Sequence, residues 1–363
     1  MKIAIDLTAL ADNFTGIERF ALNIALNMIK NCPTDHFTLV FKRKVHDAFK
    51  EFSAFTNVRF IILKEQNKLL FTQITLPMRM YQLKVDRYLF LAFPAPFIFI
   101  KSGVVSAIHD IGCWDCPDTM TVGSRYFFRI LFRKAALTNN RIVTVSEFSK
   151  KRIMQKLKVK KPRIAVIYNG FDQHFKTVRA QNDPETVKQK YGLPAKYILC
   201  LSTLEPRKNL RLLINACCSL WNAGKLDAEL VLAGRKGWKI SNLLDCLEQS
   251  HMNRIHLTGF IKDEDLPLIY KNADVFVFPS IYEGFGIPPL EAIECGTAVI
   301  SSDASSLPEV LGDAAIYFEN GNQAALEQRL TEFYSGKNYG SIGKLPRKYD
   351  WVLSAEKLRQ FLE

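Results

Sequence analysis

Several features that would assign this chain to a common class are missing from its sequence. No G-x-G-x-x-G sequence follows an apolar strand, which argues against a dinucleotide cofactor. The longest apolar run, residues 88–100, has 13 residues and two prolines, so it is too short to span a bilayer. Residues 2–6 lead straight into a polar loop, so we expect no signal peptide.

The cysteines show no metal-binding or disulfide pattern. Eight are scattered, and only Cys113 and Cys116 have C-x2-C spacing. One such pair without a second is weak evidence of zinc or redox chemistry, so we expect reduced thiols. Residues 263–265, Asp-Glu-Asp, have the spacing of a metal-binding D-x-D motif, but they directly precede an apparent helix and are better explained by an N-cap. We expect neither a metal nor a cofactor.

Acidic residues are scarce in the first half of the chain. The net charge is +13, and residues 1–175 hold 27 Lys+Arg against 13 Asp+Glu, whereas the remainder holds 22 against 23. Basic charge confined to one half predicts a surface that faces phospholipid or nucleic acid. No zinc-finger spacing or RNA-binding signature accompanies it, so we favour an anionic membrane surface and expect no nucleic acid.

Two stretches concentrate this basic charge. Arg125, Arg129 and Arg133 recur at intervals of four among apolar residues, and residues 150–161 form a second cluster. The spacing predicts a helix with an arginine stripe, which suits contact with an anionic bilayer. A core helix with an ordinary solvated basic face is the alternative.

The chain has the length and patterning of two α/β domains. At 363 residues, with 48% hydrophobic and 23% charged residues, it is long enough for two globular cores. Short apolar runs alternate with helical stretches, which predicts mostly parallel, doubly wound sheets. The expected strands are 3–7, 37–41, 58–63, 87–91, 104–108, 142–145, 164–167, 197–201, 230–232, 255–257, 275–278, 298–301 and 315–318. Polar residues 176–190 predict a linker, with the domain boundary near 172–183.

Residues 280–296, S-I-Y-E-G-F-G-I-P-P-L-E-A-I-E-C-G, are the most informative stretch. They follow the apolar strand 275–278, and the order strand, glycine loop and proline-initiated helix predicts an anion site at the helix N-terminus. Glu283 and Glu291 frame this site and accept hydrogen bonds from hydroxyls. The combination suits a nucleotide sugar. A plain turn, followed by a glutamate that the helix dipole favours, is the alternative from residue types alone.

Other candidate site residues also follow predicted strands. Arg207 and Lys208 lie at a helix N-terminus after strand 197–201, where their charge and the terminal amides favour an anion. Gly16 closes the loop after the first strand. His109 directly follows strand 104–108, a position at which a lone histidine is more often structural.

Several of these motifs resemble the retaining glycosyltransferases of family 4. Glu283, seven intervening residues and Glu291 match the family's E-x7-E motif, with Phe285 and Gly286 between them. Residues 145–150, 168–172 and 205–209 also look like family sequence. The resemblance implies the GT-B fold, in which two Rossmann-like doubly wound α/β domains face a central cleft. Residues 1–172 would bind the acceptor and be joined by a C-terminal helix at 347–363, and residues 173–346 would bind the nucleotide sugar.

The resemblance also implies a role for each matching residue. His109 and Glu283 would be catalytic and contact the transferred sugar. Thr203 occupies the position where the family has an arginine, so Arg207 would supply the missing charge beside Lys208. The remaining roles are donor phosphate binding by Arg207, Lys208 and Gly16, donor sugar binding by Phe285, Gly286 and Ile287, and nucleoside binding by Glu291, Gly259, Phe260 and Ile261.

The implied activity is metal-independent, retaining transfer of a hexose to a lipid-linked saccharide in bacterial surface polysaccharide assembly. Residues 205–209 and the G-x-x-G-W at 234–238 resemble bacterial mannosyltransferases, so GDP-mannose is the first choice of donor, with dTDP-rhamnose or a UDP-hexose as alternatives. We expect a cytoplasmic protein peripheral to the inner face of the cytoplasmic membrane. A sugar-nucleotide epimerase and a non-catalytic binding subunit are the rival interpretations.

Overall fold

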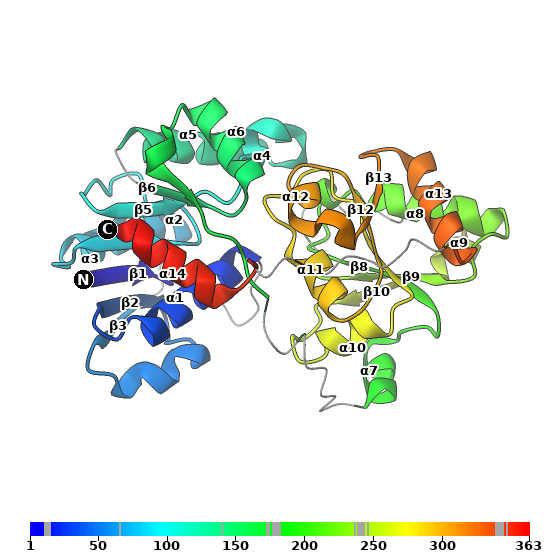
Figure 1. The fold of residues 1–363 in the computed structure, drawn as a ribbon, viewed down its shortest axis with the longest axis horizontal. Helices are drawn as coiled ribbons and strands as arrows, with labels where there is room; N and C mark the ends of the chain where they lie inside the picture. Colours follow the sequence, from blue (N-terminus) through cyan, green and yellow to red (C-terminus); the bar gives the residue numbers. More distant parts are fainter. Residues whose placement is uncertain are drawn as a thin grey trace. The chain divides into compact units, whose positions relative to one another are not determined.

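A computed structural model gives the fold of residues 1–10, 16–64, 67–138, 141–171, 175, 183–235, 237, 244, 247–337, 345 and 348–363. The chain divides into two compact units, Met1–Gly170 with Lys348–Glu363, and Phe171–Arg347. Each unit is a parallel sheet with helices packed against it (Figure 1). The predicted α/β class is therefore confirmed.

The first unit is built on a seven-stranded parallel sheet in the order β3-β2-β1-β4-β5-β6-β7. Its strands begin and end within two residues of the expected bounds. They are β1 (Lys2–Asp6), β2 (His36–Lys42), β3 (Val58–Leu63), β4 (Arg87–Phe90), β5 (Val104–Ala107), β6 (Arg141–Thr144) and β7 (Ile164–Val166). The central strands β4 and β5 are almost fully buried, as expected of a parallel sheet covered on both faces.

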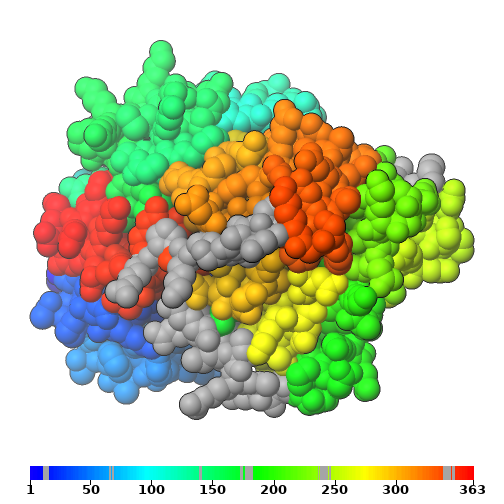
Figure 2. Space-filling model, turned by 45° about the vertical axis from the view of Figure 1, so that its right-hand side comes forward, coloured from blue at the N-terminus to red at the C-terminus, as the bar shows by residue number. Residues whose placement is uncertain are grey.

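The helices of the first unit include one from the far end of the chain. They are α1 (Gly16–Asn31), α2 (Lys68–Leu70), α3 (Leu76–Tyr81), α4 (Gly112–Asp115), α5 (Val122–Leu137), α6 (Glu147–Leu157) and α14 (Trp351–Leu362), with a π-helical turn, η2 (Phe71–Thr75), between α2 and α3. The ring of Trp351 packs edge to face against the ring of Phe20 on α1, with 6.3 Å between the ring centroids. Figures 1 and 2 both show α14, in red, beside the blue N-terminal segments.

A six-stranded parallel sheet forms the second unit, in the order β10-β9-β8-β11-β12-β13. The strands are β8 (Tyr197–Leu201), β9 (Glu229–Ala233), β10 (Ile255–Gly259), β11 (Val275–Phe278), β12 (Val299–Ser302) and β13 (Ile316–Phe318). The helices are α7 (Pro184–Tyr191), α8 (Leu210–Asn222), α9 (Gln249–Met252), α10 (Leu266–Lys271), α11 (Ile287–Glu294), α12 (Leu307–Leu311) and α13 (Gln323–Tyr334).

Two local expectations for the second unit are wrong. Part of the expected linker is helix α7, which begins because the Asp183 side chain accepts a hydrogen bond from the Thr186 amide. Asp265 occupies the N-cap position of α10, but its side chain makes no capping bond. Its buried carboxylate instead binds Lys190 Nζ at 2.6 Å and Tyr191 Oη at 2.7 Å, and so fastens α7 to α10.

The strand order fixes where a ligand can approach each sheet. In a doubly wound sheet the connections reverse direction once, and the loops at that point leave an opening beyond the carboxyl ends of the strands. The reversal lies between β1 and β4 in the first unit and between β8 and β11 in the second. The loops after β8 and β11 contain Lys208 and Glu283. Among the described residues, no helix is both long and apolar enough to cross a membrane.

Candidate functional site

A buried ion pair joins the loops that follow β8 and β11. Lys208 Nζ lies 2.5 Å from Glu283 Oε1, and Arg207 Nη1 lies 3.9 Å from Glu283 Oε2. Arg207 Nε also bonds Glu205 Oε1 at 3.1 Å, and its carbonyl accepts from the Ile281 amide at 3.0 Å. The structure thus brings Arg207, Lys208 and Glu283 together.

The charge of Glu283 depends on these cations. The carboxylate side chain is only 8% exposed, and that of Lys208 only 12%. Burial by itself would raise the pKa of Glu283, but the nearby charges of Lys208 and Arg207 outweigh it and hold the pKa below its ordinary value. Glu283 is therefore an anion at neutral pH, and it can accept hydrogen bonds from hydroxyl groups.

Serines at the end of β12 and in the segment after it hold the loop that carries Glu283. The Glu283 amide donates to Ser305 Oγ at 2.7 Å, and Ser306 Oγ donates to the Glu283 carbonyl at 2.9 Å. Ser302 Oγ donates to the Ser280 carbonyl at 2.6 Å. Ser305 has a φ of 53°, in the left-handed region that a non-glycine residue rarely adopts. Sequence reasoning missed these serines, although a Ser-rich segment after a strand was visible.

The predicted donor-sugar residues Phe285, Gly286 and Ile287 lead into α11. Gly286 has a φ of 99°, and a Cβ there would lie 2.8 Å from Leu307 Cδ2, so a side chain is excluded on both grounds. The helix begins at Ile287, one residue before the expected start, and Pro288 and Pro289 in its first turn have no N–H group. Two of the amides expected at this anion site are therefore missing, and a bound phosphate depends more on Lys208 and Arg207.

Glu291 lies deeper than its partner in the motif. The residue is 2% exposed, and Tyr270 Oη donates to its Oε2 at 3.0 Å. Tyr270 is itself held by Thr297, whose hydroxyl bonds the Tyr270 carbonyl at 2.6 Å. Tyr270 therefore orients Glu291, a role that the sequence did not reveal because the two residues belong to different helices.

The predicted nucleoside residues Gly259, Phe260 and Ile261 follow β10 at the same edge of the sheet. Gly259 has a φ of 71°, and its carbonyl accepts from the Gly234 amide at 2.8 Å, which ties the ends of β9 and β10 together. Ile261 is buried, whereas Phe260 is 38% exposed. The Arg235 guanidinium lies 5.2 Å from the Phe260 ring centroid, which adds a cation that sequence reasoning missed.

His109 and Gly16 belong to the first unit. Gly16 is the exposed first residue of α1, and the loop before it, residues 11–15, lies outside the described residues. His109 Nε2 is 2.9 Å from the Leu91 carbonyl. A carbonyl only accepts, so Nε2 carries the proton. Burial lowers the pKa of His109 below its ordinary value of 6.5, so the ring is neutral at pH 7 and Nδ1 has an acceptor lone pair.

The cysteine and acidic residues considered as metal ligands in the sequence can be located in the described part of the chain. No group of three or more His, Cys, Asp or Glu side chains there has the arrangement of a metal site. Cys113 is buried, and burial raises the pKa of its thiol to about 12, so the thiolate is scarce at neutral pH.

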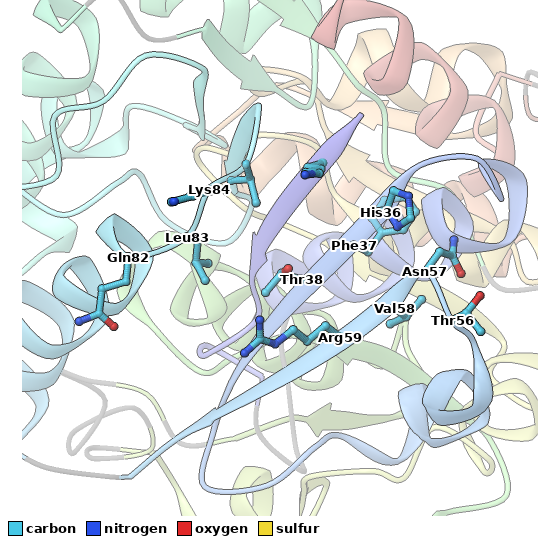
Figure 3. Close-up of a pocket in the computed structure, with 12 residues that line it drawn as sticks. His36, Phe37, Thr38, Thr56, Asn57, Val58, Arg59, Gln82, Leu83 and Lys84 are labelled. Carbon is cyan, nitrogen blue, oxygen red and sulfur yellow. The ribbon is translucent and has the colours of Figure 1, made fainter.

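A hollow of about 460 Å³ occurs at a different edge of the first sheet (Figure 3). Lys2, His36 and Val58 line it at the starts of β1, β2 and β3, and Arg59 and Lys84 add further cations. This is the amino end of the strands. The hollow is therefore separate from the carboxyl edge where His109 and Gly16 lie.

The buried pair predicts a non-additive stability effect. Lys208→Ala should lower the free energy of unfolding by about 3 kcal/mol, because it leaves the Glu283 carboxylate buried with only the more distant Arg207. Lys208→Ala combined with Glu283→Gln should recover part of that loss, because no buried charge remains unpaired. Denaturant unfolding of the two single variants and the double variant measures this. Strictly additive losses would contradict the coupling.

The same pair predicts how stability depends on pH. The pKa of Glu283 is lower in the folded chain than its ordinary value of 4.5, so its stabilising contribution is complete above pH 4.5 and is lost as the pH falls through the folded-state pKa. The stability difference between the unmodified chain and Glu283→Gln should therefore shrink below pH 4.5. A difference that stays constant would mean that Glu283 has the same pKa in both states.

Comparison with known proteins identifies relatives for this arrangement. Residues 183–349 match the family model of glycosyl transferases group 1. The chain is 33% identical over 240 residues to O-antigen chain mannosyltransferase B of Escherichia coli, covering 66% of this chain and 63% of that protein. It is 28% identical over 223 residues to O-antigen chain mannosyltransferase RfbU of Salmonella typhimurium, covering 61% and 58% respectively. The chain thus spans less than two thirds of the length of these curated relatives.

Solved structures match the fold over nearly the whole chain. Anabaena HepE in complex with UDP and glucose superposes with a TM-score of 0.71 at 18% identity, covering 100% of this chain and 99% of that chain. WaaG, a glycosyltransferase involved in lipopolysaccharide biosynthesis, superposes with a TM-score of 0.68 at 16% identity, covering 99% and 95%. Residues 183–349 thus match the glycosyl transferases group 1 model, and the chain has the two Rossmann-like sheets of the GT-B fold.

Proposed function

We propose that the chain is a retaining glycosyltransferase that moves a hexose from a nucleotide diphosphate sugar to a lipid-linked saccharide. The observation that carries this proposal is the buried contact of Lys208 with Glu283 where the strand order of the second sheet reverses. Cation and carboxylate together fit a ligand that has both phosphates and hydroxyls. The group 1 match of residues 183–349 supports the same reading.

Lys208 and Arg207 would bind the donor diphosphate. An ammonium group has three N–H donors, so Lys208 can hold Glu283 and still donate to a phosphate oxygen. Arg207 is already oriented by Glu205. As the sugar–phosphate bond breaks, negative charge grows on the diphosphate, and cations that are already in place stabilise it without reorganisation. Gly16, at the start of α1 in the first unit, is proposed as a further phosphate contact.

Carboxylates would bind the two sugars of the donor. Glu283 would accept hydrogen bonds from the transferred hexose, beside the backbone of Phe285, Gly286 and Ile287. Glu291 would lie at the ribose, oriented by Tyr270. The segment Gly259, Phe260 and Ile261 would contact the base.

The first unit is proposed to supply the acceptor site and His109. The neutral His109 ring has an acceptor at Nδ1, so it would accept a hydrogen bond from a donor hydroxyl rather than act as an obligate base. In a retaining reaction of this kind the departing phosphate itself can take the acceptor proton. No step of this scheme requires a metal ion or a cofactor.

GDP-mannose is the proposed donor. The relatives named above are mannosyltransferases of O-antigen chains, and serotype-specific mannosyltransferase WbdA of Escherichia coli is 34% identical over 224 residues, covering 59% of this chain and 27% of that protein. A dTDP- or UDP-linked hexose is the alternative donor. The acceptor is proposed to be lipid-linked at the inner face of the cytoplasmic membrane, because basic charge gathers in the first unit.

Product analysis tests the proposal directly. The protein is incubated with GDP-mannose, dTDP-rhamnose and UDP-hexoses, with and without an undecaprenyl-linked saccharide. With GDP-mannose as the donor, we expect a lipid-linked saccharide that carries one more sugar in α linkage. Conversion of the donor without an acceptor would indicate an epimerase or hydrolase instead, and nucleotide binding without any turnover would indicate a binding subunit.

Substitutions separate the roles of Lys208 and Glu283. Glu283→Ala should lower kcat by about 100-fold, because a contact to the transferred sugar is lost, while nucleoside diphosphate affinity changes little. Lys208→Ala should weaken nucleoside diphosphate binding by about 10-fold or more, because a charge-assisted hydrogen bond is lost. Lys225→Ala is a matched control, because Lys225 is an exposed cation near the amino end of β9. Retained turnover in the first variant or unchanged affinity in the second contradicts these roles.

The role of Tyr270 predicts a third effect. Tyr270→Phe removes the hydroxyl that orients Glu291 and should weaken donor binding about 5-fold, with little change in kcat. Tyr197→Phe is the control, because it removes another buried hydroxyl, one that donates to the Ile269 carbonyl at 2.7 Å. Both variants should lose about 1 kcal/mol of stability. Equal donor affinity in the two variants would show that Tyr270 has only a structural role.

A further inference from the structure

Helix α5 exposes an apolar face where a polar one is expected. Val122, Tyr126, Ile130 and Leu137 are all exposed, Leu137 to 80%, and their spacing of four, four and seven residues places them on one side of the helix. The opposite side buries Leu131, Phe132, Ala135 and Ala136 in the core. A surface helix normally presents charged or polar residues to water on the side away from the core. Here Arg133 is the one charged residue on the exposed side.

A second apolar face comes from the helical segment of residues 68–81. Leu70, Ile74, Met78 and Tyr81 are exposed at intervals of four, four and three, whereas Phe71, Leu76 and Met80 are buried beneath them. This segment and α5 are separated by more than 40 residues in the sequence. Both segments therefore bury apolar side chains on one side and expose apolar side chains on the other, where polar residues are usual.

The loop of residues 93–101 joins these two helical segments into one surface. Tyr81 Oη donates to the Ile98 carbonyl at 3.2 Å, which fixes the loop to α3. Lys134 Nζ donates to the Pro96 carbonyl at 2.9 Å and the Phe99 carbonyl at 2.6 Å, which fixes the loop to α5. The loop itself exposes Phe93, Ile98 and Ile100. We call the exposed apolar side chains of residues 69–81, 93–100 and 122–137 the apolar face.

Charge around the apolar face has one sign. Residues 67–101 and 122–137 contain nine Lys and Arg and a single acid, Asp86. The whole first unit has 30 Lys+Arg and 15 Asp+Glu, against 19 and 21 in the second. A second copy of this face would bring like charges together, so the pattern disfavours self-association through it. A partner that offers both anions and an apolar interior complements it, and an anionic phospholipid bilayer has both.

The sequence suggested that the arginines of α5 point outward, but in the structure it is mainly the apolar side chains that do so. Arg129 Nε donates to the Cys113 carbonyl at 2.7 Å, and Arg152 of the second basic cluster pairs with Asp115 at 2.6 Å. These two arginines hold α4 in place. The arginine stripe suggested by the sequence is therefore partly structural, and the apolar side chains are the ones presented outward.

We propose that the apolar face is the membrane-docking site of this protein, and that it takes an anionic phospholipid bilayer. Leu, Ile, Val, Met, Tyr and Phe side chains enter the boundary between headgroups and acyl chains, while the surrounding cations contact lipid phosphates. Two weak signals together give stable attachment where either alone is reversible. The inference deepens the membrane location proposed above, and it does not depend on the identity of the donor.

Vesicle sedimentation tests this docking in the absence of donor and acceptor. The full chain should sediment with vesicles of phosphatidylcholine and phosphatidylglycerol, and at least 10-fold less with phosphatidylcholine alone. Raising the salt concentration should weaken binding without abolishing it, because the apolar contribution is not screened. Binding that salt abolishes completely would show that only the basic charge matters, and it would overturn the role of the apolar side chains.

Substitution of the apolar side chains locates the surface. The combined change Met78→Ser, Tyr126→Ser and Ile130→Ser should reduce binding to the mixed vesicles at least 10-fold. Leu353→Ser and Val352→Ser together form the control, because both residues are exposed apolar positions of the first unit on α14, outside the apolar face. Unchanged circular dichroism and thermal unfolding show that the triple variant is folded, and unchanged nucleoside diphosphate affinity separates failure of docking from failure of the transfer reaction.

Two further results would overturn the proposal. One is equal vesicle binding by the triple variant and the unmodified chain. The other is light scattering that shows a dimer for the unmodified chain and a monomer for the triple variant, since the face would then be a protein interface.

Discussion

The buried contact between Lys208 and Glu283 is the constraint on which the second unit depends. Either charge left without the other in a site that is about nine-tenths buried would lower the stability of the fold, so each residue stabilises the other. The contact closes the gap between the loops after β8 and β11, the two strands at which the connections of the sheet reverse. A donor phosphate that approached this point would find a cation already held in place by a carboxylate. The same ion pair thus links stability to the proposed chemistry.

Much of the architecture could be predicted because strands of parallel sheets carry their signal locally. Runs such as residues 197–201 and 275–278 are continuous, apolar and short, and the structure gives them the bounds that the sequence predicts. Prediction failed where the role of a side chain depends on a residue far away in the sequence. Asp265 has the local context of an N-cap, yet its carboxylate binds Lys190 and Tyr191, more than 70 residues away.

In the candidate site, too, residues with a local sequence signal could be predicted, and most of those that depend on distant partners could not. Glu283, Lys208 and Glu291 were named from spacing and residue type, and the first two meet in the structure. Tyr270 and Ser305 were not named, because each forms a hydrogen bond with a residue more than 20 positions away, which only the fold brings near. Glu205 was not named either, although its partner Arg207 is only two residues away. The two prolines of α11 were recognised in the sequence, but the loss of their backbone N–H groups from the anion site was not. A proline favours the first turn of a helix and at the same time removes an amide from the anion site.

The division of charge between the units follows from their different proposed partners. A unit that binds a small anionic donor needs only a few cations at one place, and the second unit has nearly balanced charge over the rest of its sequence. A unit that docks on an extended anionic surface needs an excess over a wide area, because each cation contributes little by itself. The exposed apolar side chains of α5 and of residues 68–81 add a requirement that charge alone cannot meet. Basic composition could be read from the sequence, but the direction in which the apolar side chains point required the fold.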